Sequence, residues 1–285
     1  MLEKFALFFK NLSDYMKSDI SIFKTFKDAL LLTNKNIILA SPLILFVMFA
    51  SLYLMITPYN TSNIAFVLLL FFAMTSAFFS GWFYTLKLAV SEDYDKEDIF
   101  DLIKQFPAGV GQHFLQYFFM IVIFFLLFTV VVIATYKTAP LLIGNIGISR
   151  PELFLAMSSP ESMTELLKNL TLEQQTKLGQ WNLYFIFTTT LYTFLIMLWA
   201  PELMFKQESV LKAFVFSVKK TLRKFFKSLT IFSFLMILYF IIMILSAIIN
   251  LSIVQFVVTV VYFYFLLYSA MLIFLFYKRE FCDNE

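Results

Sequence analysis

The stretch that decides the fold is 118–132, which has the sequence FFMIVIFFLLFTVVV. It contains no charged residue, and its apolar residues do not alternate with polar ones. A transmembrane β-strand would alternate over about ten residues. The stretch therefore predicts a membrane-spanning helix, which satisfies its own backbone hydrogen bonds in lipid.

Five further apolar runs have the same character, and each is long enough to cross ~30 Å of hydrocarbon at 1.5 Å per residue. The chain of 285 residues is 61% hydrophobic and 14% charged, whereas soluble domains carry about 25% charged residues. We predict an all-α polytopic transmembrane bundle with amphipathic interfacial helices, forming a single membrane domain over 1–285. The six spans are expected at about 37–57, 63–90, 113–136, 181–203, 229–250 and 254–277.

The residue types in this sequence give little indication of a catalytic function. The single cysteine, Cys282, excludes an internal disulfide or a cysteine-based metal cluster, and His113 is the only histidine. Phosphate-loop, zinc-protease and nucleophile-elbow motifs are missing. Ionisable groups are nearly missing from the span centres, which argues against a proton-driven pump. We expect no catalytic residue, no metal and no cofactor, and therefore a non-enzymatic protein.

The longest connection between spans is the loop 137–180. Within it, Ser158 with Glu161 and Thr171 with Gln174 have capping-box spacing, and Pro160 suits a first helical position. We therefore expect two short helices in this loop. Because its only basic residues are Lys137, Arg150, Lys168 and Lys177, whereas the other connections and both ends are richer in lysine, the positive-inside rule predicts cytoplasmic termini.

Amphipathic stretches are expected at 1–17 and in front of spans one, three and five, at about 20–33, 97–106 and 209–227. The last is the most basic. Its cations fall on one helical face, and its apolar residues fall on the other. This face predicts contact with anionic lipid headgroups or with a partner protein; the alternative is a topology determinant only. The cations are Lys212, Lys219, Lys220, Arg223, Lys224 and Lys227.

A second charged feature is the acidic loop on the same predicted side. Three interpretations are open: a solvated loop, pairing with the basic face, or binding of a divalent cation. The spacing lacks the glycine and the final glutamate of an EF-hand loop. The acidic residues considered are Glu92, Asp93, Asp95, Glu97, Asp98 and Asp101.

The end of span four carries Pro201 and Glu202. Proline should kink or end the helix there. A carboxylate near the membrane is a functional candidate, but Lys206 lies four residues further on. We expect Glu202 to form a structural ion pair with Lys206 at the membrane boundary or to belong to the cap region of the helix. In span two, Ala73, Ala77 and Gly81 are small residues four apart, which favours close helix packing or, alternatively, a dimer interface.

Several segments resemble a group of prokaryotic six-helix membrane proteins, namely the YciC-like proteins and the membrane domain attached to some glycerophosphodiester phosphodiesterases. The segments are Phe26-Lys27-Asp28-Ala29, Asn34-Lys35-Asn36 with Pro42, Ala200-Pro201-Glu202, Ala213 to Ser217 before Lys219-Lys220, and Phe276-Tyr277-Lys278-Arg279. The resemblance implies a six-helix membrane fold. It does not carry over phosphodiesterase activity, since the phosphodiesterase domain is not part of this sequence.

The leading functional hypothesis is an inner-membrane protein that acts in envelope homeostasis through contacts with lipids or with a partner protein. We expect no nucleic acid among its partners. The competing hypothesis is a transporter or permease subunit. It requires a polar cavity between the spans, lined by residues such as Thr188, Thr189, Thr190, Thr193, Asn250 and Gln255.

Overall fold

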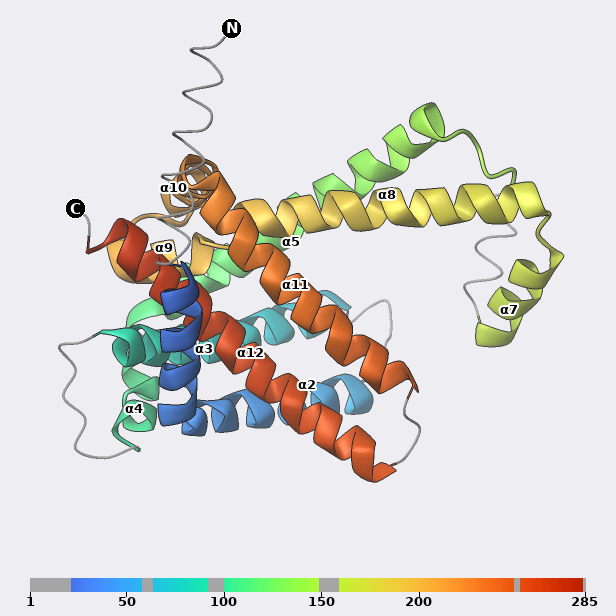
Figure 1. The fold of residues 1–285 in the computed structure, drawn as a ribbon. Coiled ribbons are helices and arrows are strands. Elements are labelled where there is room, and N and C mark those ends of the chain that lie inside the picture. The colour runs from blue at the N-terminus through green and yellow to red at the C-terminus, as the bar shows by residue number, and fades with distance from the viewer. Residues whose placement is uncertain (1–21, 58–63, 92–99, 149–158, 249–251, 284–285) are drawn as a thin grey trace, which may run out of the picture. The chain divides into compact units, whose positions relative to one another are not determined.

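The computed structural model describes residues 22–57, 64–91, 100–148, 159–248 and 252–283, and these ranges contain helices and no strand (Figure 1). The short helices are a segment at 22–35, η1 (Ile37–Leu39), α4 (Asp101–Lys104), α7 (Pro160–Asn169), α9 (Trp199–Lys206) and α10 (Val210–Arg223). The long helices are α2 (Ala40–Ile56), α3 (Ile64–Val90), α5 (Phe106–Leu142), α8 (Leu172–Ile196), α11 (Phe225–Ile248) and α12 (Ser252–Phe281).

Within the described ranges, six helical stretches are long and apolar enough to cross a membrane, which confirms the predicted all-α multi-pass fold. They are Ile37–Ile56, Ile64–Val90, Phe106–Leu142, Leu172–Lys206, Phe225–Ile248 and Val254–Phe281. The segment 1–17, where a further amphipathic helix is expected, lies outside the described residues. Helices are expected in front of spans one, three and five. The helix 22–35 and α10 have nearly the expected length, whereas α4 is a single turn.

The chain contains two compact units. Unit 1 comprises Met1–Ile121 and Ile196–Glu285, and unit 2 comprises Val122–Leu195. Two helices, α5 and α8, continue from one unit into the other. The two units are described separately below.

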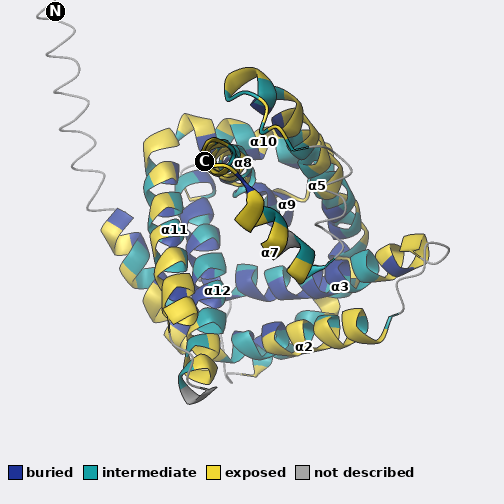
Figure 2. Ribbon diagram, turned by 90° about the vertical axis from the view of Figure 1, so that its right-hand side faces the viewer, coloured by how far each residue is buried: buried dark blue, intermediate teal, exposed yellow. Residues whose placement is uncertain are grey.

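In unit 1, burial is concentrated on α3 and α12, whereas α2 and α11 are largely exposed (Figure 2). A close approach between α3 and the first turns of α5 explains the small residues of span two. A Cβ atom on Gly109 would lie 2.5 Å from Cβ of Tyr84, and one on Gly81 would lie 2.7 Å from the Phe106 ring. Glycine is therefore required where α3 and α5 cross, and Gly81 allows these two helices of the same chain to pack closely.

Unit 2 is an antiparallel pairing of α5 and α8 with polar contacts along its length. The Tyr192 hydroxyl donates to the Phe124 carbonyl, 3.0 Å. The hydroxyls of Thr135 and Thr188 lie 2.9 Å apart, as do those of Thr138 and Tyr184. Such hydrogen bonds contribute to helix association in a membrane, where the apolar contacts of a helix are as favourable with lipid as with protein.

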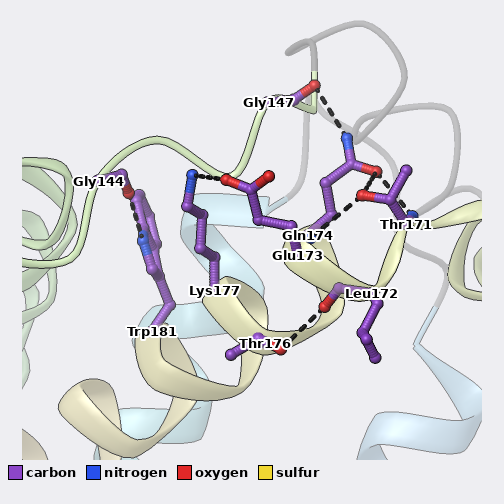
Figure 3. Close-up of polar contacts among 9 residues, drawn as sticks. All are labelled: Gly144, Gly147, Thr171, Leu172, Glu173, Gln174, Thr176, Lys177 and Trp181. Atoms are coloured by element: carbon purple, nitrogen blue, oxygen red, sulfur yellow. Dashed lines mark hydrogen bonds and ion pairs between the residues drawn. The ribbon is translucent and has the colours of Figure 1, made fainter.

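The spans formed by α5 and α8 extend beyond the predicted 113–136 and 181–203, and the predicted outer loop 137–180 is correspondingly too long. The expected capping box is present: the Thr171 N–H donates to Oε1 of Gln174, 3.0 Å, and the Gln174 N–H donates to the Thr171 hydroxyl, 3.3 Å (Figure 3). However, it begins the long helix α8 and not a separate short helix. The other expected helix is α7, whose N-cap is Ser159 and whose first residue is Pro160.

The junction of α8 and α9 shows the effect of Pro201. The ring of a proline within a helix clashes with the carbonyl four residues earlier, which here belongs to Met197. Helix α8 ends at Ile196, and α9 begins at Trp199 with Pro201 in its first turn. The predicted interruption is therefore confirmed, and it lies on the N-terminal side of Pro201. Because Pro201 stands in the first turn of α9, its missing N–H costs no hydrogen bond within that helix.

Candidate functional site: a charged clamp at the end of α12

The last turns of α12 carry four consecutive polar residues, each of which contacts a different part of unit 1. We call these four residues and their partners the C-terminal clamp. Tyr277 contacts α9 and α10, Lys278 the end of α3, Arg279 the helix 22–35, and Glu280 the α10–α11 junction. Consecutive helical residues point about 100° apart, so one turn reaches neighbours on all sides.

Glu202 of α9 is at the centre of the clamp, with a side chain 2% exposed. Its Oε2 accepts a hydrogen bond from the Tyr277 hydroxyl, 2.7 Å, and pairs with Nζ of Lys220, 2.8 Å. Lys220 Nζ also lies 2.8 Å from the Tyr277 oxygen, and 5.3 Å from the centre of the Phe281 ring. A buried carboxylate is costly unless it is paired and hydrogen-bonded, and Glu202 has both kinds of partner.

Glu280 holds the junction between α10 and α11. Its two carboxylate oxygens pair with Nζ of Lys224, 3.0 Å, and of Lys227, 2.5 Å. Lys224 has a non-helical backbone and separates the two helices. On another side of α12, Arg279 forms an ion pair with Asp28, 2.6 Å, and donates to the Thr25 hydroxyl, 3.2 Å. The clamp therefore fixes both α10 and the helix 22–35 to α12.

Two lysines of unit 1 stabilise helix C-termini, whose last carbonyls lack partners within the helix. Lys278 Nζ donates to the Val90 carbonyl at the end of α3, 3.1 Å. Lys87 Nζ donates to the Met204 carbonyl near the end of α9, 3.0 Å, and lies 5.6 Å from the centre of the Phe205 ring. The charge of each lysine thus faces the partial negative charge of a helix end.

The predicted basic face of 209–227 divides into two sets. Lys220, Lys224 and Lys227 form the ion pairs of the clamp. Within the described part of the chain, the remaining three cations form no ion pair and are exposed: Lys212, Lys219 and Arg223. We call Lys220, Lys224 and Lys227 the inner set, and Lys212, Lys219 and Arg223 the outer set. Within the outer set, Lys219 and Arg223 lie one helical turn apart, so the set follows a single stripe along α10.

Apolar residues of α10 are exposed beside the outer set. Leu211 is 62% exposed, Val215 46% and Leu222 52%. The buried residues of α10 are instead small, namely Ala213, Ser217 and Thr221, and α10 packs against α9. The helix thus has small residues toward the protein and large apolar residues away from it.

The partner expected for Glu202 is corrected by the structure. Glu202 pairs with Lys220, eighteen positions along the chain, rather than with Lys206 at helical spacing. The reason is the turn that follows α9, where Gln207 has the left-handed conformation, φ 51°. This conformation reverses the chain, so that α10 returns along α9 and brings Lys220 to the carboxylate.

The acidic loop is only partly within the described residues. Asp93, Asp95, Glu97 and Asp98 lie in 92–99, outside them. Asp101 begins α4 and pairs with Lys104, 2.7 Å, three residues further on. Among the described residues, no group of three or more histidine, cysteine or acidic side chains is placed to hold a metal ion.

Three of the threonines expected to line a polar cavity, Thr188, Thr189 and Thr193, donate hydrogen bonds within α8, and Thr188 also accepts one from Thr135 of α5. The Thr188 hydroxyl donates to the Phe185 carbonyl, 3.0 Å, and that of Thr189 to the same carbonyl, 2.8 Å. Thr193 donates to the Thr190 carbonyl, 2.9 Å. Asn250 lies outside the described residues, and Gln255 is exposed on α12.

Sequence reasoning from charge patterns missed Glu280 as the partner of two basic residues, and it did not relate Asp28 to Arg279. These pairs join positions more than fifty residues apart, so no local spacing indicates them. Four segments that carry the resemblance described above nevertheless meet in the clamp, through Asp28, Glu202, Lys220 and Tyr277.

Comparison with known proteins finds no family model, no curated protein and no solved structure that matches this chain.

Proposed function

We propose that this chain is a non-enzymatic protein of the cell inner (plasma) membrane that acts through its α10 surface, which contacts anionic lipids or a membrane-protein partner. In this proposal both termini are cytoplasmic, and α10 lies along the cytoplasmic membrane surface. The role that we propose for these contacts is in the maintenance of the cell envelope.

The observation that carries the proposal is the division of the α10 cations into an inner and an outer set. The inner set forms ion pairs with two carboxylates, Glu202 and Glu280. The outer set is exposed beside large apolar side chains, an arrangement typical of helices that bury an apolar face in the lipid boundary. Each cation near an anionic surface contributes roughly 1 kcal/mol of attraction.

The clamp also supports the proposed orientation. It joins the helix 22–35, the end of α3, the α9–α10 region and the end of α12. These segments hold most of the basic residues outside the spans. Because lysine-rich connections remain on the cytoplasmic side of a membrane, their meeting at one end of unit 1 is the arrangement that cytoplasmic termini require.

The test compares two matched triple variants of the full chain. The outer variant carries Lys212→Gln, Lys219→Gln and Arg223→Gln, and the inner variant carries glutamine at 220, 224 and 227. Purified proteins are held in a neutral amphipol, which supplies no bilayer, and their binding to vesicles with and without phosphatidylglycerol is measured at two salt concentrations.

The outer variant should bind anionic vesicles at least tenfold more weakly, since three cations at roughly 1 kcal/mol each exceed the ~1.4 kcal/mol of a tenfold change, while its melting temperature stays close to that of the wild type. The inner variant should instead unfold at a lower temperature. Equal binding of the outer variant and the wild type to anionic vesicles would refute the lipid contact.

A further inference from the structure

A cavity lies within unit 1, between α2, α3, α9 and α12. Its volume is about 290 Å³, and all its lining residues are buried or half-buried. Leu43 of α2 is 6% exposed, Trp82 of α3 3% and Phe274 of α12 1%. The cavity is therefore an internal space between four helices and is not part of the outer apolar surface of the spans.

One wall of the cavity is the interruption between α8 and α9, through Met197, Ala200 and Pro201. A helical carbonyl accepts a hydrogen bond from the N–H four residues later. For Met197 that position is Pro201, which has no N–H. Among the described residues, no group donates a hydrogen bond to the Met197 carbonyl, whereas the Ala200 carbonyl accepts one from the Tyr117 hydroxyl, 3.1 Å. This wall therefore has one acceptor without a donor.

The hydrogen-bond donors among the lining side chains are already used. The Trp82 indole N–H donates to the Leu39 carbonyl, 2.9 Å, and the Ser269 hydroxyl donates to the Phe265 carbonyl, 2.7 Å. The other lining side chains are apolar. A buried water molecule typically makes about three hydrogen bonds, and this lining has no free donor for it. An occupant that satisfies the Met197 carbonyl is therefore mostly apolar and brings its own donor.

The size and the walls of the cavity indicate the shape of the occupant. An apolar cavity of about 150 Å³ binds benzene, so a space about twice as large accommodates a molecule of about two rings. Three neighbouring aromatic rings line it: the centre of the Phe83 ring lies 5.5 Å from that of Trp82 and 5.4 Å from that of Phe274. Aromatic rings pack favourably against one another. Because the cost of an empty apolar cavity rises with its volume, such an occupant stabilises unit 1.

The geometry points to a binding site for a small membrane-soluble phenol or alcohol in the cavity between α2, α3, α9 and α12. Its hydroxyl donates to the Met197 carbonyl, and its apolar body lies against Trp82 and Phe274. The site is independent of the outer set of α10 cations, because its ligand is uncharged and lies between the helices.

Binding of tritium-labelled naphthol to the full chain in phosphatidylcholine nanodiscs tests this site, and empty nanodiscs measure the naphthol that dissolves in the lipid. Naphthalene, which has the same two rings without the hydroxyl, is the matched competitor. Ala270→Leu fills the cavity from α12, and Pro201→Ala supplies the missing N–H to the Met197 carbonyl. Their controls are Ala247→Leu, at an exposed position of α11, and Pro140→Ala, within α5.

Naphthol should bind the wild type saturably, and naphthalene should compete about tenfold less well at equal concentration in the lipid, which corresponds to ~1.4 kcal/mol for the hydroxyl. Pro201→Ala should bind naphthol about tenfold more weakly and naphthalene unchanged. Ala270→Leu should weaken both, and the two controls should bind like the wild type.

Three results would overturn the proposal: naphthol binding to the wild type that does not saturate, naphthalene that competes as well as naphthol, or naphthol binding that Ala270→Leu leaves unchanged. The first two need no variant, so they decide the question even if a variant fails to fold. Weaker vesicle binding by the outer variant of α10 does not affect these measurements, so this proposal and the proposed function fail separately.

Discussion

Glu202 and Lys220 form an ion pair of 2.8 Å between α9 and α10, and the Tyr277 hydroxyl completes it from α12. Three helices distant in the sequence thus share one buried carboxylate. Breaking a buried pair by removing one partner leaves an uncompensated charge and costs about 3–5 kcal/mol, whereas replacing both partners with apolar groups is often neutral. The pair is therefore a sensitive point for the stability of unit 1.

Replacement of Glu202 by alanine should lower the free energy of unfolding by about 3–5 kcal/mol, because Lys220 then remains buried without its counter-charge. The double variant Glu202→Met with Lys220→Met should recover most of this loss. Thermal unfolding in one detergent measures both. Glu173→Gln, which removes an exposed pair with Lys177 in unit 2, is the control and should melt like the wild type. A single variant as stable as this control would show that the pair does not hold α9 to α10.

The crossing of α3 and α5 gives a second prediction. Gly109→Ala places a Cβ atom 2.5 Å from Cβ of Tyr84. Overpacking of this kind lowers the free energy of unfolding by about 1–3 kcal/mol. At Gly111, two residues further on, an added Cβ atom would have nothing within 4 Å. Gly111→Ala should therefore be neutral or stabilise by up to about 1 kcal/mol, the difference in helix propensity. Equal melting temperatures for the two variants would contradict the close approach.

The start of α8 gives a third prediction. Thr171→Ala removes the cap of Gln174 and should destabilise the first turns of α8 by about 1 kcal/mol. Hydrogen exchange of the amides 173–178 should then accelerate, with little change elsewhere. Thr176→Ala is the matched control, because its hydroxyl donates to the Leu172 carbonyl within the same helix, 2.8 Å, and caps nothing. Faster exchange in the control than in Thr171→Ala would refute the capping role.

Trp82 gives a fourth prediction, since its indole Nε1 donates to the buried Leu39 carbonyl, 2.9 Å, and so ties α3 to the segment before α2. Trp82→Phe retains an aromatic ring against Phe78 but removes this hydrogen bond, at a cost of about 0.5–1.5 kcal/mol, since the Leu39 carbonyl, as the N-cap of α2, still accepts a bond within the helix. Thermal unfolding measures the loss, and Phe83→Leu, which alters a neighbouring ring without removing a hydrogen bond, controls for packing. A melting temperature that Trp82→Phe leaves unchanged would show that the bond is dispensable.

The sequence predicted the spans well because hydropathy is a property of contiguous residues. It also located the Thr171 cap and the interruption at Pro201, since both depend on neighbours within four positions. The lengths of α5 and α8 were underestimated, because helices continue through polar residues such as Glu173 and Lys177 that end an apolar run but not a helix.

The clamp was predicted only in fragments. Spacing along one helix favours Lys206 as the partner of Glu202, and nothing about glutamine indicates the left-handed turn at Gln207 that brings Lys220 instead. Half of the basic face was therefore assigned to outside contacts, although these lysines form ion pairs within unit 1. Charge patterns reveal which face of a helix is cationic, but the acidic partners of Lys220 and Lys224 come from other helices.

The position of the clamp in the chain has a consequence for biosynthesis. Tyr277 to Glu280 follow all the helices that they contact, so they emerge from the ribosome after those helices have been inserted. Until then, Glu202 and the inner lysines lack the last of their partners. The contacts of unit 1 are therefore complete only after α12 has been translated.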